Sequence, residues 1–418
     1  LALNLTWLLG FYSFLLGGVL FPVTLGVWWS GRERPGGGWA ATLAALMVLG
    51  YFAHLVSLGL TVVGLVVLAV MTPGANRRGR WAWTGAALLP LVPLGLVYRR
   101  LMTGGGAVRP IWGVLQEGIG SADVWSRQMG WIDPLTLGRK TALPFVAMPR
   151  AWFGLFAPIF WFSLALAALA AAIVWPAAGR LDSAASASRH ERRGWAVLAA
   201  LLLLGGLAGP DTLGPGHGNY LPQRLFLLGL VALVPVWELD GKRPLVRLAA
   251  LLLTGALVVQ SAYVWDYALI SDRRAGAIAR AVPAVGRNMR VGTLLIGIQG
   301  PYRANPILHV DNQLGIGTGN IVWNNYETAH YYFPVQFRPD LRHPPAFVFE
   351  EVAIRDDPAD APERARLWEQ LLQEYHDLLD VLVVWGSDPR LDGITARWFD
   401  PEPMYDDGWV RVLRRRGR

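Results

Sequence analysis

Long apolar segments dominate the first 265 residues, whereas the rest of the chain mixes apolar and charged positions as soluble domains do. The apolar segments lie at approximately 4–29, 39–71, 81–98, 151–175, 195–207, 225–237 and 245–263. A helix that spans a membrane needs about 20 residues to cross about 30 Å of hydrocarbon. The pattern therefore predicts an α-helical polytopic membrane bundle over residues 1–265 and a small soluble domain over residues 266–418.

The second apolar segment is too long for a single span. Residues 39–71 would extend about 50 Å as one helix at a rise of 1.5 Å per residue. A glycine and a polar imidazole interrupt the run at Gly50 and His54. We expect the helix to break there, which raises the predicted number of transmembrane helices to about eight.

Basic residues predict which side of the membrane each connection faces. Four short connections carry Lys or Arg, at residues 30–38, 73–80, 176–194 and 239–247. Short basic connections stay in the cytoplasm. The segments 99–150 and 208–224 and the whole C-terminal domain are then expected on the outer side.

The C-terminal region reads as a small α/β domain. Helices are expected at 272–285 and 362–375, and strands at 291–298, 379–385 and 408–413. A strand, a helical connection and another strand favour a right-handed crossover between parallel strands. The aromatic-rich stretch 309–338 is expected to be mostly loop.

Composition supports the membrane interpretation and argues against disulfide-stabilised, thiolate metal-binding and nucleic-acid-binding proteins. The chain is 53% hydrophobic and 16% charged, against about 25% charged residues in soluble proteins. It has no cysteine, which excludes disulfides and thiolate metal sites. The formal net charge is +8, but the basic residues lie in the membrane connections, so nucleic acid is not an expected partner.

The strongest candidate site combines His54 with the outward loop that precedes the sixth apolar segment. The candidate substrate-binding residues are His54, Asp211, His217, Asn219, Tyr220, Gln223 and Arg224. An arginine at headgroup depth can hold a phosphate through its forked donors. The simpler interpretation is that Arg224 only anchors the helix to lipid phosphates and that His54 is satisfied by water or a carbonyl group.

Two further groups of polar residues are weaker candidates. Asp123, Arg127 and Asp133 lie in the long outward loop and are expected to be solvated. The stretch 110–129, which contains the first two, is either a short interfacial helix or an amphipathic loop that covers the bundle. The soluble domain has a polar and aromatic group, which comprises His309, Asp311, Asn312, Asn324, Asn325, Tyr326, His330 and Arg338. Such residues suit carbohydrate recognition, although a well hydrogen-bonded loop has the same composition.

Several short motifs together resemble a known group of membrane enzymes. They are the first helix followed by a basic loop, Tyr51–Leu55 in the broken helix, Arg224–Phe226, and Leu308–His309 ahead of Pro334–Pro339. The chain resembles the C-terminal part of bacterial membrane proteins related to the GT-C glycosyltransferases. The resemblance implies transfer of a sugar from a polyprenyl-phosphate donor to an envelope acceptor, at the outer face of the cytoplasmic (inner) membrane.

The same resemblance leaves the catalytic residue unassigned. GT-C enzymes carry their catalytic carboxylate in the first outward loop, which is expected upstream of Leu1. The implied partners are membrane lipid and a polyprenyl-phosphate-linked sugar; no cofactor is firmly indicated, and a divalent cation is compatible with the chemistry. A non-enzymatic transporter or scaffold of envelope assembly is the main alternative, and lipid-linked oligosaccharide polymerisation or ligation is a third.

Overall fold

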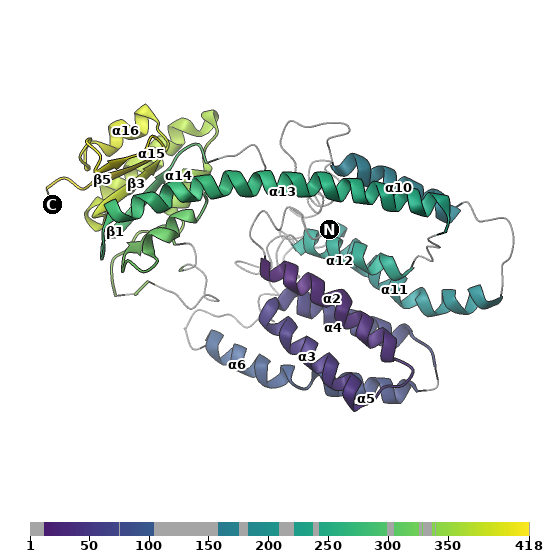
Figure 1. Cartoon of the computed structure of the whole chain (residues 1–418). Helices are drawn as coiled ribbons and strands as arrows, with labels where there is room; N and C mark the ends of the chain where they lie inside the picture. Colours follow the sequence, from purple (N-terminus) through teal and green to yellow (C-terminus); the bar gives the residue numbers. More distant parts are fainter. Residues whose placement is uncertain are drawn as a thin grey trace. The chain divides into compact units, whose positions relative to one another are not determined.

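A computed structural model describes most of the chain and divides it into two compact units between Ser261 and Ala262 (Figure 1). The described residues are 12–74, 76–103, 158–174, 183–208, 221–236, 242–298, 305–325, 328, 337–338 and 340–417. The described part is mostly helical, with one small sheet in the second unit.

The first unit is helical. Its helices are α2 (Tyr12–Gly31), α3 (Gly37–Ala53), α4 (Leu55–Met71), α5 (Arg77–Leu88), α6 (Leu91–Thr103), α10 (Pro158–Val174), α11 (Ser183–Ala208), α12 (Leu221–Leu233), the 3-10 turn η4 (Val234–Val236) and the start of α13 (Pro244–Val285). Helices α2, α3, α4, α11 and α12 share one buried core, in which Phe21, Met47, Leu68, Leu198 and Leu228 meet.

Three helical segments of the described part are long and apolar enough to cross a membrane. They are Tyr12–Gly31, Arg77–Tyr98 and Pro244–Val285. Helices α3 and α4 have 17 residues each, or roughly 26 Å at 1.5 Å per residue, and so fall short of that length. The structure therefore indicates a membrane protein without confirming eight transmembrane helices.

The predicted break in the second apolar segment is confirmed. Helix α3 ends at Ala53 and α4 begins at Leu55, with only His54 between them. The backbone of His54 is extended, with φ −168° and ψ 118°, and its N–H donates to Gly50 O at 2.9 Å. One residue therefore separates the two helices.

Two predicted boundaries are wrong. Helix α11 begins at Ser183, inside the stretch 176–194 that was expected to be a connection. Helix α13 is a single helix of 42 residues, so the predicted membrane segment and the predicted helix 272–285 are parts of one element. No proline lies between Pro244 and Pro283, and the aspartates near residue 270 do not interrupt a helix.

The second unit contains a five-stranded sheet with the order β2-β1-β3-β5-β4. Its strands are β1 (Arg290–Leu295), β2 (Ile321–Val322), β3 (Val381–Trp385), β4 (Tyr405–Asp406) and β5 (Val410–Arg414). The predicted parallel pair is confirmed, because β1 runs parallel to β3 with Val291 opposite Val381. Strand β5 is antiparallel to β3, and the two-residue strands β2 and β4 were not predicted.

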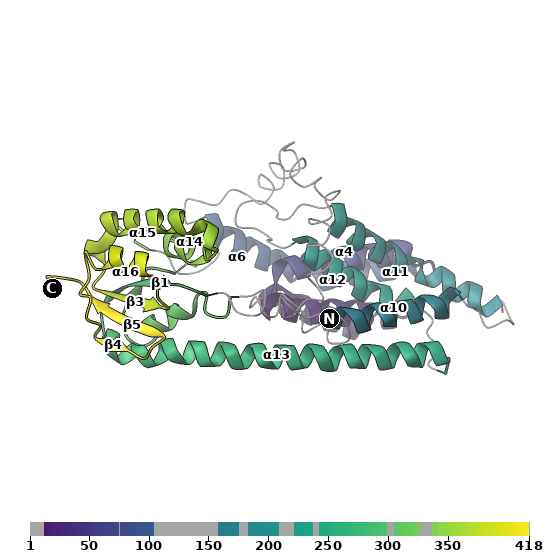
Figure 2. The ribbon, with the colours of Figure 1, turned by 90° about the horizontal axis from the view of Figure 1, so that it is seen from above.

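Helices cover both faces of this sheet (Figure 2). The helical elements after β1 are η5 (Val310–Gly315), α14 (Val348–Ile354), η7 (Pro358–Asp360), α15 (Ala361–Tyr375), η8 (His376–Leu378) and α16 (Pro389–Thr395). Alternate residues of β1 enter two cores: Val291 and Leu295 pack with the end of α13, whereas Leu294 packs with α14 and α15. The predicted helix 362–375 corresponds to α15.

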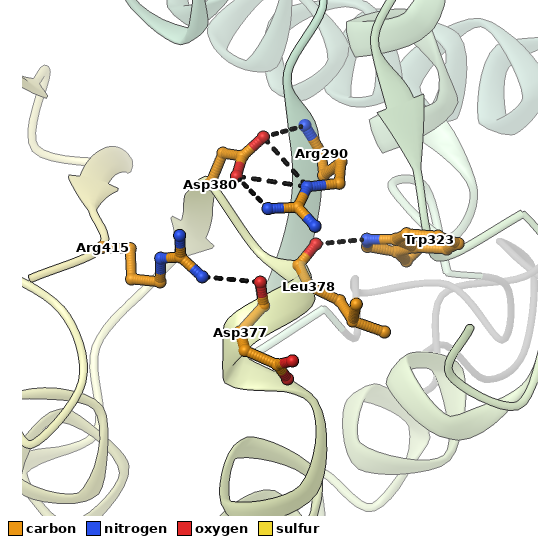
Figure 3. Close-up of polar contacts among 6 residues, drawn as sticks. All are labelled: Arg290, Trp323, Asp377, Leu378, Asp380 and Arg415. Carbon is orange, nitrogen blue, oxygen red and sulfur yellow. Dashed lines mark hydrogen bonds and ion pairs between the residues drawn. The ribbon is translucent and has the colours of Figure 1, made fainter. Parts of the chain in front are cut away.

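An ion pair fastens the amino ends of β1 and β3 (Figure 3). Arg290 Nη2 donates to Asp380 Oδ1 at 2.6 Å, and its backbone N–H donates to Asp380 Oδ2 at 3.0 Å. Beside this pair, Trp323 Nε1 donates to Leu378 O at 3.0 Å, which fixes the chain where it leaves β2.

A second ionic group lies beyond the carboxyl ends of the same strands. Arg364 donates to Asp356 Oδ1 at 3.0 Å and to Asp388 Oδ2 at 2.7 Å. Asp356 also accepts the backbone N–H of Gly297, just after β1, at 3.0 Å. One buried guanidinium thus joins the segments that follow β1, α14 and β3.

Candidate functional site

The structure brings His54 and Arg224 into direct contact. Arg224 Nη1 lies 2.9 Å from His54 Nε2. Arg224 is 5% exposed and sits in the first turn of α12, whereas His54 is the residue that precedes α4. The amino ends of two helices therefore meet at this hydrogen bond, and each end carries partial positive charge.

The contact with Arg224 determines the tautomer of His54. A guanidinium has only donors, so Nε2 must be the unprotonated nitrogen and Nδ1 carries the hydrogen. Ser57 Oγ, 3.4 Å from Nδ1, is then the acceptor for that hydrogen. The backbone N of Ser57 also lies 3.3 Å from Nδ1, so in the other tautomer Nδ1 would accept this N–H and Nε2 would be free to donate.

Helix α2 supplies the apolar wall of the site. The fully buried ring of Phe14 lies 5.0 Å from the guanidinium carbon of Arg224 and meets the imidazole of His54 edge to face at 5.5 Å. A cation over a ring face is attracted by the ring quadrupole. Phe14 therefore holds both polar side chains in place while it excludes water from one side.

Glycines allow the helices around the site to approach closely. A Cβ added at Gly17 would lie 2.7 Å from Ser57 Cβ and 3.2 Å from His54 Cβ, so only glycine fits there. A Cβ at Gly206 of α11 would lie 2.9 Å from Pro222 O, and one at Gly229 of α12 would lie 2.9 Å from Leu203. These contacts set the position of the first turn of α12.

Gln223 contributes a second polar group to the same turn. It is 8% exposed, and its Oε1 is buried with no hydrogen-bond partner among the residues that the structure describes. A buried carbonyl oxygen without a donor is costly, because it has lost its hydration. The amide is therefore a second group near Arg224 that a ligand could satisfy.

The structure brings together only some of the predicted substrate-binding residues, and their role stays a prediction. His54 and Arg224 come together and Gln223 is adjacent, whereas Asp211, His217, Asn219 and Tyr220 lie outside the described residues. The same holds for Asp123, Arg127 and Asp133, and for the stretch 110–129.

Sequence reasoning missed three residues of the site, namely Phe14, Gly17 and Ser57. Ser57 gave no signal, because a cap uses only the backbone N–H of the third helical residue, which any residue type supplies. Phe14 and Gly17 gave none, because α2 is apolar on all sides and its face toward α4 cannot be read from a pattern.

No metal or cofactor is assigned to this site. Within the described ranges, no three side chains of His, Asp or Glu lie close enough together to hold a metal ion.

In the second unit, part of the predicted polar and aromatic group is assembled. Asn324 Nδ2 donates to Asp311 Oδ2 at 2.7 Å. Burial raises the pKa of Asp311 to about 6, against hydrogen bonds from Asn324 and Thr293 that lower it. Burial also lowers the pKa of His309 to about 4. Tyr326 and His330 lie outside the described residues.

Comparisons with known proteins add no further assignment. No protein-family model, curated protein or solved structure matches the chain. The function is therefore argued from the geometry of the site together with the sequence.

Proposed function

We propose that the chain belongs to a membrane glycosyltransferase of the GT-C type and that Arg224 and His54 bind the phosphate of its polyprenyl-phosphate donor. The observation that carries this proposal is the partly buried hydrogen bond between Arg224 Nη1 and His54 Nε2, 2.9 Å long, between the amino ends of α4 and α12. A guanidinium and two helix amino ends all favour an anion at the same place.

A phosphate can replace the hydrogen bond between Arg224 and His54 with stronger hydrogen bonds from both side chains. His54 offers the guanidinium a neutral acceptor, whereas a phosphate offers an ionised one, and charge-assisted hydrogen bonds are about twice as strong. When Arg224 turns to the phosphate, His54 can take the other tautomer. Its Nδ1 then accepts the Ser57 N–H, and Nε2–H donates to the anion.

The proposal places the protein in a bacterial cytoplasmic membrane, with several spans and an extracytoplasmic C-terminal unit. Its support is the placement of Lys and Arg in short connections together with the three membrane-length helices. Apolar helix surfaces would hold the prenyl chain, and the acceptor would be an envelope component. The second unit would then lie on the side where polyprenyl-phosphate sugars are consumed.

A binding experiment tests the role of Arg224. The purified full chain in detergent is titrated with a polyprenyl monophosphate and, separately, with the same polyprenol without phosphate, and binding is followed by native mass spectrometry. We expect a preference for the phosphate that falls about 10- to 100-fold in Arg224→Ala, because hydrogen bonds to charged groups contribute about 1.5–3 kcal/mol. Arg224→Lys should keep part of the preference for the phosphate, since lysine retains the positive charge but lacks the paired N–H donors of the guanidinium.

The matched control is Arg78→Ala, an exposed arginine in the first turn of α5. It should leave the preference unchanged. Equal binding of phosphate and alcohol by the unmodified chain would overturn the proposal and favour a scaffold of envelope assembly. If the preference for the phosphate fell equally in the Arg78 and Arg224 variants, it would reflect general attraction of an anionic lipid by positive charge and not a specific site.

A further inference from the structure

A polar cluster inside the second unit joins four elements around one carboxylate. Thr293 Oγ1 of β1 donates to Asp311 Oδ2 at 2.7 Å, and Asn324 Nδ2, two residues after β2, donates to the same oxygen at 2.7 Å. Asp311 and Asn324 are both fully buried. Glu350 of α14 is close enough for the charge of Asp311 to raise the pKa of its carboxyl group, in addition to the larger effect of burial.

Three oxygens of this cluster have no side-chain donor among the described residues. Asp311 Oδ1, Asn324 Oδ1 and Glu350 Oε2 are buried and lack a well-aligned hydrogen bond. The backbone N–H groups of Asp311 and Asn312 lie close enough to the Asp311 carboxyl group to lower its pKa, but they carry no net charge. The orientation of the Asn324 amide is fixed, because the reversed orientation would place its oxygen against Asp311 Oδ2. All three atoms can therefore act as acceptors at once.

Among the residues that the structure describes, none supplies a charge to compensate for them. Neither Asp311 nor Glu350 forms an ion pair in the described structure. Burying acceptors and carboxylates without partners is expensive, so a group of them in a folded core points to a missing electropositive partner. A proton shared by the two carboxyl groups would satisfy at most one oxygen of each and would still leave Asn324 Oδ1 without a donor.

The chemistry of the ligand set points to one class of partner. Carboxylate, amide and hydroxyl oxygens are the ligands of hard cations, which complete their shells with water. The chain contains no cysteine, and within the described ranges no third acidic or histidine side chain joins Asp311 and Glu350. Soft or borderline ions such as copper and zinc therefore find no set of sulfur and nitrogen ligands here.

We propose that Asp311, Asn324 and Glu350 bind a hard divalent cation, Ca²⁺ or Mg²⁺, within the C-terminal unit. The ion links η5, the segment after β2 and helix α14 to the edge of the parallel strands. This site is separate from the proposed phosphate site and does not depend on glycosyltransferase activity. Its role is to hold together segments that the two-residue strand β2 secures only weakly.

The test is calorimetric titration of the full chain in detergent, after treatment with EDTA, with CaCl₂ and in a second arm with MgCl₂. We expect binding in at least one arm, and a decrease in affinity of about 10-fold or more in both Asp311→Asn and Glu350→Gln, because charge count sets affinity in such sites. Both substitutions keep the shape of the side chain. The matched control is Glu351→Gln, the exposed neighbour on α14, which should bind as the unmodified chain does.

Other results contradict the proposal. No binding of either ion at millimolar concentration would overturn it, and so would equal affinity in the unmodified chain and the Glu350→Gln variant. If Asp311→Asn fails to fold, as judged by circular dichroism and size-exclusion chromatography, Glu350→Gln decides the question alone. An increase in thermal stability caused by the ion and lost in Glu350→Gln would support the site independently.

Discussion

Arg224 Nη1 lies 2.9 Å from His54 Nε2, although 170 positions separate the two residues in the chain. This contact predicts strong coupling between them. In a double-mutant cycle, His54→Ala and Arg224→Ala should each weaken binding of a polyprenyl phosphate. The double variant should lose less binding free energy than the sum of the losses in the two single variants. The difference, which is the coupling energy, should be about 1–3 kcal/mol. Additive effects in the titration would mean that the two side chains act separately.

Gly17 should be intolerant of a single methyl group. In Gly17→Ala the added Cβ would lie 2.7 Å from Ser57 Cβ, so α2 and α4 must separate and His54 must move. We expect a loss of about 1–3 kcal/mol, as for overpacked cores, seen as a lower melting temperature in detergent.

The control for this substitution lies nine residues along the same helix. Gly26 is exposed, and an added Cβ would meet nothing within 4 Å. Gly26→Ala should therefore be neutral or raise the melting temperature slightly, because alanine favours a helix over glycine. Equal destabilisation by both substitutions would contradict the close contact at Gly17.

The ion pair between Arg290 and Asp380 should contribute far more to stability than its exposed counterpart between Arg338 and Asp340. The carboxylate of Asp380 is 3% exposed, whereas that of Asp340 is 59% exposed. Asp380→Ala leaves a partly buried guanidinium unpaired and should cost about 2–3 kcal/mol. Asp340→Ala should cost about 0–1 kcal/mol, which thermal unfolding of the two variants can distinguish.

Asp311 should make stability depend on pH in a direction unusual for an acid. Its pKa is raised to about 6 in the folded chain, so folding favours the protonated form. That contribution is complete below the unfolded pKa of about 3.9 and disappears as pH rises through about 6, by up to about 3 kcal/mol. The lowered pKa of His309, about 4, acts in the opposite direction over an overlapping range.

The effect of Asp311 is therefore isolated by comparison with Asp311→Asn, which retains His309. In EDTA, the melting temperature of the unmodified chain minus that of the variant should decrease between about pH 4 and 6 and then level off. A difference that does not change with pH would mean that Asp311 keeps an ordinary pKa.

The proposed topology can be tested by reporter fusions. Reporters near His217 and after Trp385 should both report the extracytoplasmic side, and one near Lys242 should report the cytoplasm, because short basic connections stay inside. Opposite signals from the first two fusions would exclude the proposed arrangement.

The sequence predicted those helices and strands whose positions depend only on the residues of their own segment. The interruption at His54 was visible because a polar residue inside an apolar run is costly, and β1 and β3 were visible as short apolar runs. The length of α13 was not, because a change from apolar to charged composition does not end a helix when no proline or cap is present. Strands β2 and β4 were missed because two residues carry no periodicity.

The candidate site was harder to predict, because it depends on contacts between distant segments. The sequence identified His54 and Arg224 by their unusual positions, but Phe14 becomes part of the site only through the packing of α2. In the second unit, Asp311 and Asn324 belonged to a polar stretch that the sequence marked. Thr293 and Glu350 were missed because a threonine in a strand and a glutamate in a short helix are ordinary.

The arginine shared by two carboxylates in the second unit has a consequence for what this sheet can accept. Arg364 neutralises only one of the charges on Asp356 and Asp388, and Asp311 and Glu350 add further acidic groups near the strands. Open parallel sheets commonly receive their ligands beyond the carboxyl ends of the strands, and nucleotides need positive or neutral surroundings there. Here Arg274 donates to Ile298 O at 3.2 Å and Arg411 donates to Gly386 O at 3.1 Å, just beyond the same strands, so basic groups accompany the carboxylates at this edge.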